Sequence, residues 1–189
     1  MGNTIALADD AARRYLVRNS VSTTETERFV DPHHLRTVLA QWATGVVVVT
    51  TTRPDREPHG MTASSFTGVA LTPPLVSVCL LSSGTTCREI RRNGVFAVNV
   101  LGHDHEQIGR RFAESDRAAD RFALGDWDAA TTGAPVLTDA VAWLDCLVTA
   151  CHTAGDHTIV LGSVQDAATP RPAAPLIYHD RTFHEGTAR

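Results

Sequence analysis

The sequence predicts a mainly β protein, an antiparallel barrel with a few short helices on its outside. About seven segments rich in β-branched and apolar residues follow one another after residue 30, as expected for strands. Most neighbouring segments are separated by short polar turns, which favours hairpins and antiparallel pairing. The chain has neither a G-x-G-x-x-G motif nor a P-loop, so a doubly wound sheet with a Rossmann dinucleotide site is not supported.

Length and composition are those of one globular domain. The chain has 189 residues, of which 43% are hydrophobic and 20% are charged. A chain of this length buries roughly 70% of its unfolded surface, which is enough for a substantial core. We expect the domain to span residues 29–189. Residues 1–28 are expected to form an arm that is disordered or packs on a partner subunit.

Charge and hydropathy argue against two classes of partner. The formal net charge is −4 at pH 7, so sequence-independent binding to nucleic acid is not expected. No apolar run approaches the ~18 residues that span a bilayer, so no membrane partner is expected.

The four cysteines, Cys79, Cys87, Cys146 and Cys151, form no C-x-x-C pair. We expect them to be reduced, as in a cytoplasmic protein.

The first part of the domain predicts one helix and two strands. Asp31 as N-cap and Pro32 at the first helical position predict a helix of about three turns. The run 46–51, four valines followed by two threonines, has the composition of a buried strand. After a polar loop at 53–58, the chain is expected to return as a second strand over 59–69.

Further strands and helices follow at short intervals. Thr86 and Glu89 match a capping box, so a helix is predicted over 86–92. A later helical stretch places Ile108 and Phe112 on its inner face, and a polar segment follows over 114–132. The remaining predicted strands are 75–81, 95–101, 141–151, 157–167 and 176–183.

Two clusters of small hydroxyl residues mark the candidate ligand site. The first is the turn Gly60–Phe66, and the second is Ser82–Thr86, which leads into the predicted helix. Small side chains let backbone N–H groups approach a ligand closely, and a helix N-terminus favours an anion such as phosphate. The pattern indicates a ligand with a polar group at each end. The alternative is that these residues only form turns and a helix cap.

Short motifs along the chain carry a family resemblance. They are ATGV with VT at 43–50, GMTASSF at 60–66, PPLV at 73–76, FAVNVL at 96–101, FA at 112–113, RF at 121–122, Trp127, GAPVL at 133–137, AWL with Cys at 142–146, GDHTI at 155–159 and PLIYH at 175–179. This ordered set resembles the flavin reductase family, which has the FMN-binding split-barrel fold. Its members are the small reductase partners of two-component flavin monooxygenases, and the resemblance covers almost the whole domain.

The resemblance implies which residues contact the flavin ring. The GMTASSF stretch of the family lies along the isoalloxazine and the ribityl chain. Thr62, Ala63, Ser64 and Ser65 would therefore contact flavin, largely through backbone groups. Asn99, on the strand 95–101, would border the flavin.

The resemblance also places the flavin phosphate after the third strand. The family usually has a serine and a threonine two residues apart there, and the matching positions are Gly84 and Thr86. Because Gly84 has no hydroxyl, Ser83 or Thr85 is expected to take the place of the serine, beside Thr86.

Two sets of polar side chains near these segments have more than one interpretation. Gly155, Asp156 and His157 match the segment that meets the nicotinamide nucleotide in the family. His157 is the expected catalytic side chain, because an imidazole at a hairpin tip can hydrogen-bond the carboxamide or the pyrophosphate. By spacing alone it would be a surface histidine. Arg88 is within reach of the phosphate, but with Arg91–Arg92 it is expected to form a solvated helix face.

The function implied by the resemblance is that of an NAD(P)H:flavin oxidoreductase. The enzyme would use FMN or FAD with NADH or NADPH, and these cofactors carry the hydride-transfer chemistry themselves. Its partner would be a flavin-dependent monooxygenase that receives reduced flavin by diffusion, and its assembly would be a homodimer. No metal site is expected. Two alternatives stay open: an enzyme with tightly held FMN that acts directly on a small molecule, and a non-catalytic flavin- or haem-binding protein.

Overall fold

The computed structural model describes residues 29–53, 57–114 and 118–187. The chain divides into two units between Thr37 and Val38, and residues 29–37 are the described part of the first unit. The predicted arm, residues 1–28, lies outside the described residues.

The predicted start of the first helix is confirmed. Helix α2 (Pro32–Leu39) begins after Asp31, whose Oδ1 accepts the backbone N–H groups of His33 and His34, both at 3.0 Å. These bonds satisfy two of the amides that a helix N-terminus leaves without partners. The helix ends at Leu39, and Gln41 and Trp42 follow in turns.

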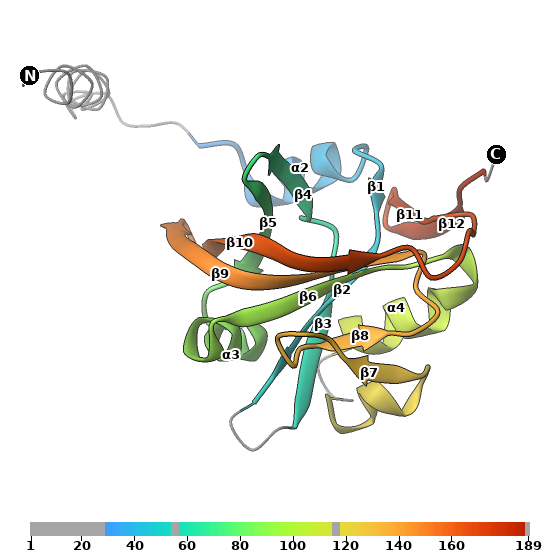
Figure 1. Ribbon diagram of the computed structural model, residues 1–189. Coiled ribbons are helices and arrows are strands. Elements are labelled where there is room, and N and C mark those ends of the chain that lie inside the picture. Colours follow the sequence, from blue (N-terminus) through green and yellow to red (C-terminus); the bar gives the residue numbers. More distant parts are fainter. Residues whose placement is uncertain (1–28, 54–56, 115–117, 188–189) are drawn as a thin grey trace, which may run out of the picture. The chain divides into compact units, whose positions relative to one another are not determined.

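The described part of the larger unit is built on a seven-stranded sheet (Figure 1). Every neighbouring pair in it is antiparallel, which confirms the predicted mainly β class. The strands in sheet order are β3 (Pro58–Ala63), β2 (Val47–Thr52), β6 (Val95–Val100), β9 (Ala142–Ala154), β10 (His157–Ala168), β5 (Pro74–Leu81) and β4 (Thr67–Leu71).

The sheet is rolled up, because β3 and β4 lie at its opposite edges and yet follow one another in the chain. Only residues 64–66 connect Ala63, at the end of β3, to Thr67, at the start of β4. Four Cα steps span at most about 14 Å. In a flat sheet, six strand spacings would separate the two edges by about 29 Å. The single strand predicted over 59–69 is therefore wrong: the chain leaves one edge at residue 63 and joins the other at residue 67.

Two smaller antiparallel sheets are added to the large one. One contains β1 (Thr44–Gly45), β11 (Leu176–His179) and β12 (Thr182–Glu185), and the other is the hairpin of β7 (Trp127–Ala129) and β8 (Pro135–Leu137). The single strand predicted over 176–183 is wrong. Asp180 and Arg181 adopt left-handed backbone conformations, with φ of 45° and 63°, and the chain reverses there.

Two hydrophobic cores lie on opposite faces of the valine run 46–49. The odd-numbered valines join Phe96 inside the rolled sheet, and the even-numbered valines join Phe112 on the outside. A strand buried on both faces has a continuous apolar sequence instead of an alternating one. Helix α3 (Thr85–Asn93) adds Ile90 to the inner core.

The outer core is covered by helical segments and by the β7–β8 hairpin (Figure 1). Its covering segments include the 3-10 turn η1 (His103–His105), helix α4 (Glu106–Ala113) and the 3-10 turn η2 (Ala118–Ala123). Within the described residues, no helix reaches the length and apolarity that a bilayer crossing requires. The four cysteines are free thiols, as predicted.

His59 makes the stability of this fold depend on pH. Only 7% of the residue is exposed. Burial, with help from the charges of Arg53 and Arg121, lowers its pKa from 6.5 to about 4. Between these two pH values the unfolded chain binds more protons than the folded chain, so the free energy of unfolding must fall as the pH falls.

We expect His59→Gln to flatten this pH dependence. One differential proton contributes a slope of at most about 1.4 kcal/mol per pH unit, present between pH 6.5 and 4 and absent above pH 7. Urea unfolding at pH 4.5, 5.5 and 7.5 measures it, with exposed His34→Gln as the matched control. An equal slope in the wild type and in His59→Gln would assign the pH dependence to other groups.

Candidate functional site

The predicted ring-binding turn lies at the seam where the two sheet edges meet. Ser65 fixes it to β5: its hydroxyl donates to the Cys79 carbonyl at 2.8 Å and accepts the Cys79 N–H at 3.1 Å. The Thr62 hydroxyl donates to the Gly109 carbonyl of α4 at 2.6 Å. Both hydroxyls are therefore used within the protein. Exposed Ser64 and the backbone groups of the turn remain for a ligand.

A cavity of about 430 Å³ opens beside this turn. It combines the polar turn with an aromatic wall and two arginines that come from α4 and from the β11–β12 hairpin. Its lining residues are Val46, Thr62, Ala63, Ser64, Arg110, Ala113, Glu114, Tyr178, Arg181 and Phe183.

Arg110 has a defined orientation in the wall of this cavity. Its Nε donates to Glu106 Oε1 at 2.7 Å, and its guanidinium carbon lies 4.9 Å from the centroid of the Phe183 ring. Phe183 packs in turn on Tyr178, with ring centroids 5.3 Å apart. A guanidinium held by a carboxylate and an aromatic face suits recognition of a planar polar ligand.

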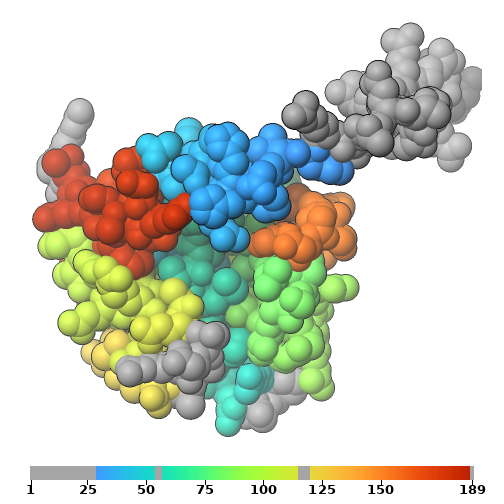
Figure 2. Space-filling view, turned by 180° about the vertical axis from the view of Figure 1, so that it is seen from behind, coloured from blue at the N-terminus to red at the C-terminus, as the bar shows by residue number. Residues whose placement is uncertain are grey.

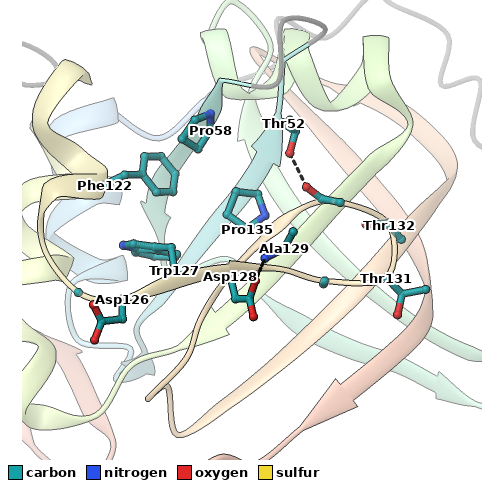
Figure 3. Close-up of a pocket in the computed structure, with 13 residues that line it drawn as sticks. Thr52, Pro58, Phe122, Asp126, Trp127, Asp128, Ala129, Thr131, Thr132 and Pro135 are labelled. Atoms are coloured by element: carbon teal, nitrogen blue, oxygen red, sulfur yellow. Dashed lines mark hydrogen bonds between the residues drawn. The ribbon is translucent and has the colours of Figure 1, made fainter.

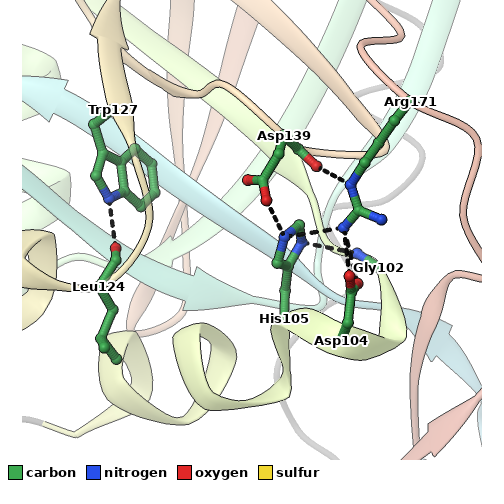
Figure 4. Close-up of polar contacts among 7 residues, drawn as sticks. All are labelled: Gly102, Asp104, His105, Leu124, Trp127, Asp139 and Arg171. Atoms are coloured by element: carbon green, nitrogen blue, oxygen red, sulfur yellow. Dashed lines mark hydrogen bonds and ion pairs between the residues drawn. The ribbon is translucent and has the colours of Figure 1, made fainter.

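A polar clamp anchors the loop that leads into β11 (Figure 4). Arg171 Nη2 donates to both carboxylate oxygens of Asp104, at 2.9 and 2.8 Å, and its Nε donates to the Asp139 carbonyl at 2.6 Å. Buried His105 accepts the Gly102 N–H at Nδ1, so its Nε2 donates to Asp139 Oδ2 at 3.2 Å. The hydrogen bond from Arg171 keeps the pKa of Asp104 below its ordinary value. The clamp thus anchors the loop that precedes the β11–β12 hairpin, and none of its residues lines the cavity.

The second hydroxyl cluster lies against the tip of the β9–β10 hairpin. The Ser82 N–H donates to the Asp156 carbonyl at 2.9 Å, and Ser82 Oγ lies 2.8 Å from Thr158 Oγ1. In Figure 2 the orange surface of this hairpin adjoins the green surface around α3. Gly155, with φ of 60°, allows the tight turn at the tip. The predicted phosphate segment and the predicted nicotinamide segment are therefore neighbours.

His157 lies at this hairpin tip with 47% of its side chain exposed. Its Nδ1 is 2.6 Å from Asp156 Oδ1, and this hydrogen bond lowers the pKa of the Asp156 carboxyl. Because a carboxylate only accepts hydrogen bonds, Nδ1 carries the proton. Nε2 is then the ring nitrogen that remains for a ligand.

Helix α3 begins beside the same hairpin without a capping side chain. Within the described residues, no side chain bonds the N-terminal amides after Gly84, the N-cap residue, which has an extended backbone. Thr86 is buried, and the Thr85 hydroxyl accepts a hydrogen bond from Arg88 Nη2 at 3.3 Å. Of the predicted phosphate ligands, exposed Ser83 is the one whose side chain lines a cavity.

This second cavity has a volume of about 510 Å³ and a strongly basic lining. It is formed by Ser82, Ser83, Arg88, Arg91 and Arg92. The three arginines occupy positions i, i+3 and i+4 of α3, which lie on one helix face.

Asn99 lies within the sheet and lines none of the three cavities described here. It is fully buried, its Nδ2 donates to the Val48 carbonyl at 3.1 Å, and its Oδ1 accepts the Leu137 N–H at 2.7 Å. It joins β6 to β2 and to β8, so its side-chain amide is used within the protein, and its contact with flavin stays a prediction. A buried amide with matched partners cannot be distinguished from a ligand contact by sequence alone.

A third cavity, of about 760 Å³, lies beneath the β7–β8 hairpin (Figure 3). Phe122, Trp127, Pro58 and Pro135 surround it, and the Thr52 hydroxyl donates to the Gly133 carbonyl at 2.6 Å across its rim. None of the residues predicted to bind a ligand lines it.

The site includes residues that the sequence did not single out. Helix α4 and the β11–β12 hairpin contribute Arg110, Tyr178, Arg181 and Phe183 to the cavity lining. No local motif predicts that these segments lie beside the turn 62–64. For Arg91 and Arg92 a signal existed, since their spacing with Arg88 predicts one shared face. That face lines a cavity together with two serines, which the expectation of a solvated helix face did not foresee.

Residues 39–187 match the flavin reductase like domain, so the chain belongs to this family. It is 37% identical over 150 residues to the reductase subunit HsaB of a flavin-dependent monooxygenase from Rhodococcus jostii, covering 79% of this chain and 75% of that protein. It is 40% identical over 158 residues to a flavin reductase (NADH) from Kitasatospora aureofaciens, covering 82% of this chain and 81% of that protein. The structure of the NADH:FAD oxidoreductase SgcE6 from Streptomyces globisporus, in complex with NAD and FAD fragments, superposes with a TM-score of 0.75 at 37% identity, covering 83% and 95% of the two chains.

We expect Ser65→Ala to weaken flavin binding through the position of the turn. The substitution removes the acceptor of the Cys79 N–H and the donor to the Cys79 carbonyl. The turn then loses roughly 1–3 kcal/mol of the free energy that holds it against β5. The dissociation constant for flavin, measured by fluorescence titration, should rise about 5- to 150-fold, which is the same free energy expressed as a ratio of dissociation constants. Thr67→Ala is the matched control, because its hydroxyl reaches only the neighbouring Gly68 carbonyl, at 3.3 Å. Wild-type affinity in a destabilised Ser65→Ala protein would contradict the role of this turn.

Proposed function

We propose that this protein is an NAD(P)H:flavin oxidoreductase that reduces FMN or FAD and supplies the reduced flavin to a partner monooxygenase. The observation that carries the proposal is the bond between the Ser82 N–H and the Asp156 carbonyl, which joins the segment predicted to bind the flavin phosphate to the segment predicted to meet the nicotinamide nucleotide. An enzyme that passes a hydride between two nucleotides needs both held in one place. The names of the relatives, which are flavin reductases and a monooxygenase reductase subunit, support the same activity.

The residues present fit a flavin. The turn 62–65 offers small side chains and backbone groups to a planar ring system, and Arg110 is held in a fixed orientation beside it. The start of α3 offers uncapped amides, and the cavity with Ser83 offers cations to a phosphate. When bound, the flavin would supply the acceptor for the hydride of the reduced nicotinamide.

The protein's own contribution is to bind and orient. Backbone N–H groups of the turn 62–65 would donate hydrogen bonds to the polar edge of the ring, where charge develops. Asp156 would hold His157 with Nδ1 protonated, and Nε2 would meet a polar group of the nicotinamide nucleotide. Gly155 allows the hairpin tip to approach that nucleotide closely.

Exposed apolar residues support the proposed homodimer. In the larger unit, Leu71 is 94% exposed and Trp42 is 74% exposed, and Val38, Leu39 and Val69 are also exposed. Apolar surface of this kind favours burial against a second copy of the chain. A cytoplasmic location and the delivery of reduced flavin by diffusion are part of the same proposal.

The first test is oxidation of NADH and NADPH, followed at 340 nm, by protein stripped of flavin. We expect turnover to depend on added FMN or FAD, because the proposed enzyme releases the reduced flavin to its partner. Turnover without added flavin, by protein that retains FMN, would indicate a self-contained enzyme. Flavin binding without turnover would indicate a non-catalytic binder.

A second test concerns His157. His157→Ala should raise the KM for the nicotinamide nucleotide about 5- to 30-fold, the effect of one lost hydrogen bond of roughly 1–2 kcal/mol, with little change in flavin affinity. His152→Ala is the matched control, since it removes an exposed histidine of the same hairpin on the strand away from β5. A nucleotide KM equal to that of the wild type would remove His157 from the site.

A further inference from the structure

The basic cavity on α3 has its arginines spread over more than one helical turn, which is a longer stretch than a single phosphate group occupies. Arg88, Arg91 and Arg92 face it together with Ser82 and Ser83. Arg88 is the one with an acidic neighbour: its Nε lies 3.5 Å from Glu89 Oε1. Among the described residues, no carboxylate forms an ion pair with Arg91 or Arg92, which are both exposed.

The arginines extend well beyond the helix start. The four residue steps from Arg88 to Arg92 advance about 6 Å along the helix axis. A phosphate bound at the N-terminal amides of α3 would lie close to Arg88, which contacts the Thr85 hydroxyl at 3.3 Å. Arg91 and Arg92 would lie about one helical turn further along the axis. These two guanidiniums therefore suit a second anionic group further along the helix.

We propose that Arg91 and Arg92 bind the second phosphate and the adenosine of FAD, so that this chain selects FAD over FMN. The inference rests on the proposed function and assigns its flavin. Guanidinium groups form bidentate hydrogen bonds with phosphate oxygens and stack on flat rings, so both parts of an adenosine phosphate find a partner in this pair. The cavity volume of about 510 Å³ leaves room for such a group along the helix face.

The test compares riboflavin, FMN and FAD, which carry no phosphate, one phosphate and two phosphates. Dissociation constants are measured by fluorescence titration for the wild type and for the double variant Arg91→Ser/Arg92→Ser. We expect the wild type to bind FAD at least 10-fold more tightly than FMN. We expect the double variant to lose about 10- to 100-fold in FAD affinity and less than 3-fold in FMN and riboflavin affinity.

Two further variants separate a specific contact from a general effect of charge or folding. Arg36→Ser, on α2, removes one exposed arginine outside the cavity lining and should leave all three affinities unchanged. Arg91→Lys/Arg92→Lys keeps both charges but loses the planar fork, and should recover part of the FAD affinity. An equal loss for FAD and FMN, or for all three flavins, would overturn the proposal.

A last measurement distinguishes FAD from the nicotinamide nucleotide, which also contains an adenosine diphosphate. With riboflavin as acceptor, the KM for NADH should be the same in the wild type and in the double variant. A raised KM for NADH with unchanged FAD affinity would assign the arginines to that nucleotide and overturn the proposal. If the wild-type protein binds FMN and FAD with equal affinity and reduces both, the proposed selection of FAD is overturned, and the proposed function is unaffected. A wild type that binds no flavin and oxidises no NADH would instead remove the proposed function.

Discussion

The structure depends on a short connection between the two edges of one sheet. Residues 64–66 carry the chain from the end of β3 to the start of β4, which are the outermost strands of the seven. Because three residues cannot span a flat sheet of that width, the sheet has to roll up around its inner core. The connection is held by Ser65, whose one hydroxyl satisfies both backbone groups of Cys79.

The same constraint places the site. A connection between two sheet edges lies outside the regular ladder, so its backbone groups are free of strand partners. Small residues are needed where the edges come close, and they leave those groups accessible. A polar, backbone-rich turn is therefore a direct consequence of closing the sheet, and α4 and the β11–β12 hairpin then add Arg110 and the aromatic wall around it.

Much of the fold was predictable because it depends on local composition. The buried run 46–49, the Asp31–Pro32 helix start and the paired strands of the β9–β10 hairpin all carry short-range signals. Two strand predictions failed where the chain reverses or crosses without a glycine or proline to mark it: Ser64–Phe66 between β3 and β4, and Asp180–Arg181 in the last hairpin. In both places, strand-forming residues stand on either side of the break.

The limits of the site prediction have a different cause. Motifs predicted the turn 62–65, Ser83 and His157 as ligand contacts, because each belongs to one continuous segment, and residues 62–64 and Ser83 do line cavities. The sequence could not show that Ser82 and Asp156, 74 positions apart (156 − 82), would share a hydrogen bond. Nor could it show that the side-chain amide of Asn99 would form hydrogen bonds with the backbone of Val48 and Leu137. The sequence shows which hydrogen bonds each side chain can form. Whether they are formed with a ligand or with the protein itself depends on the packing of the folded chain.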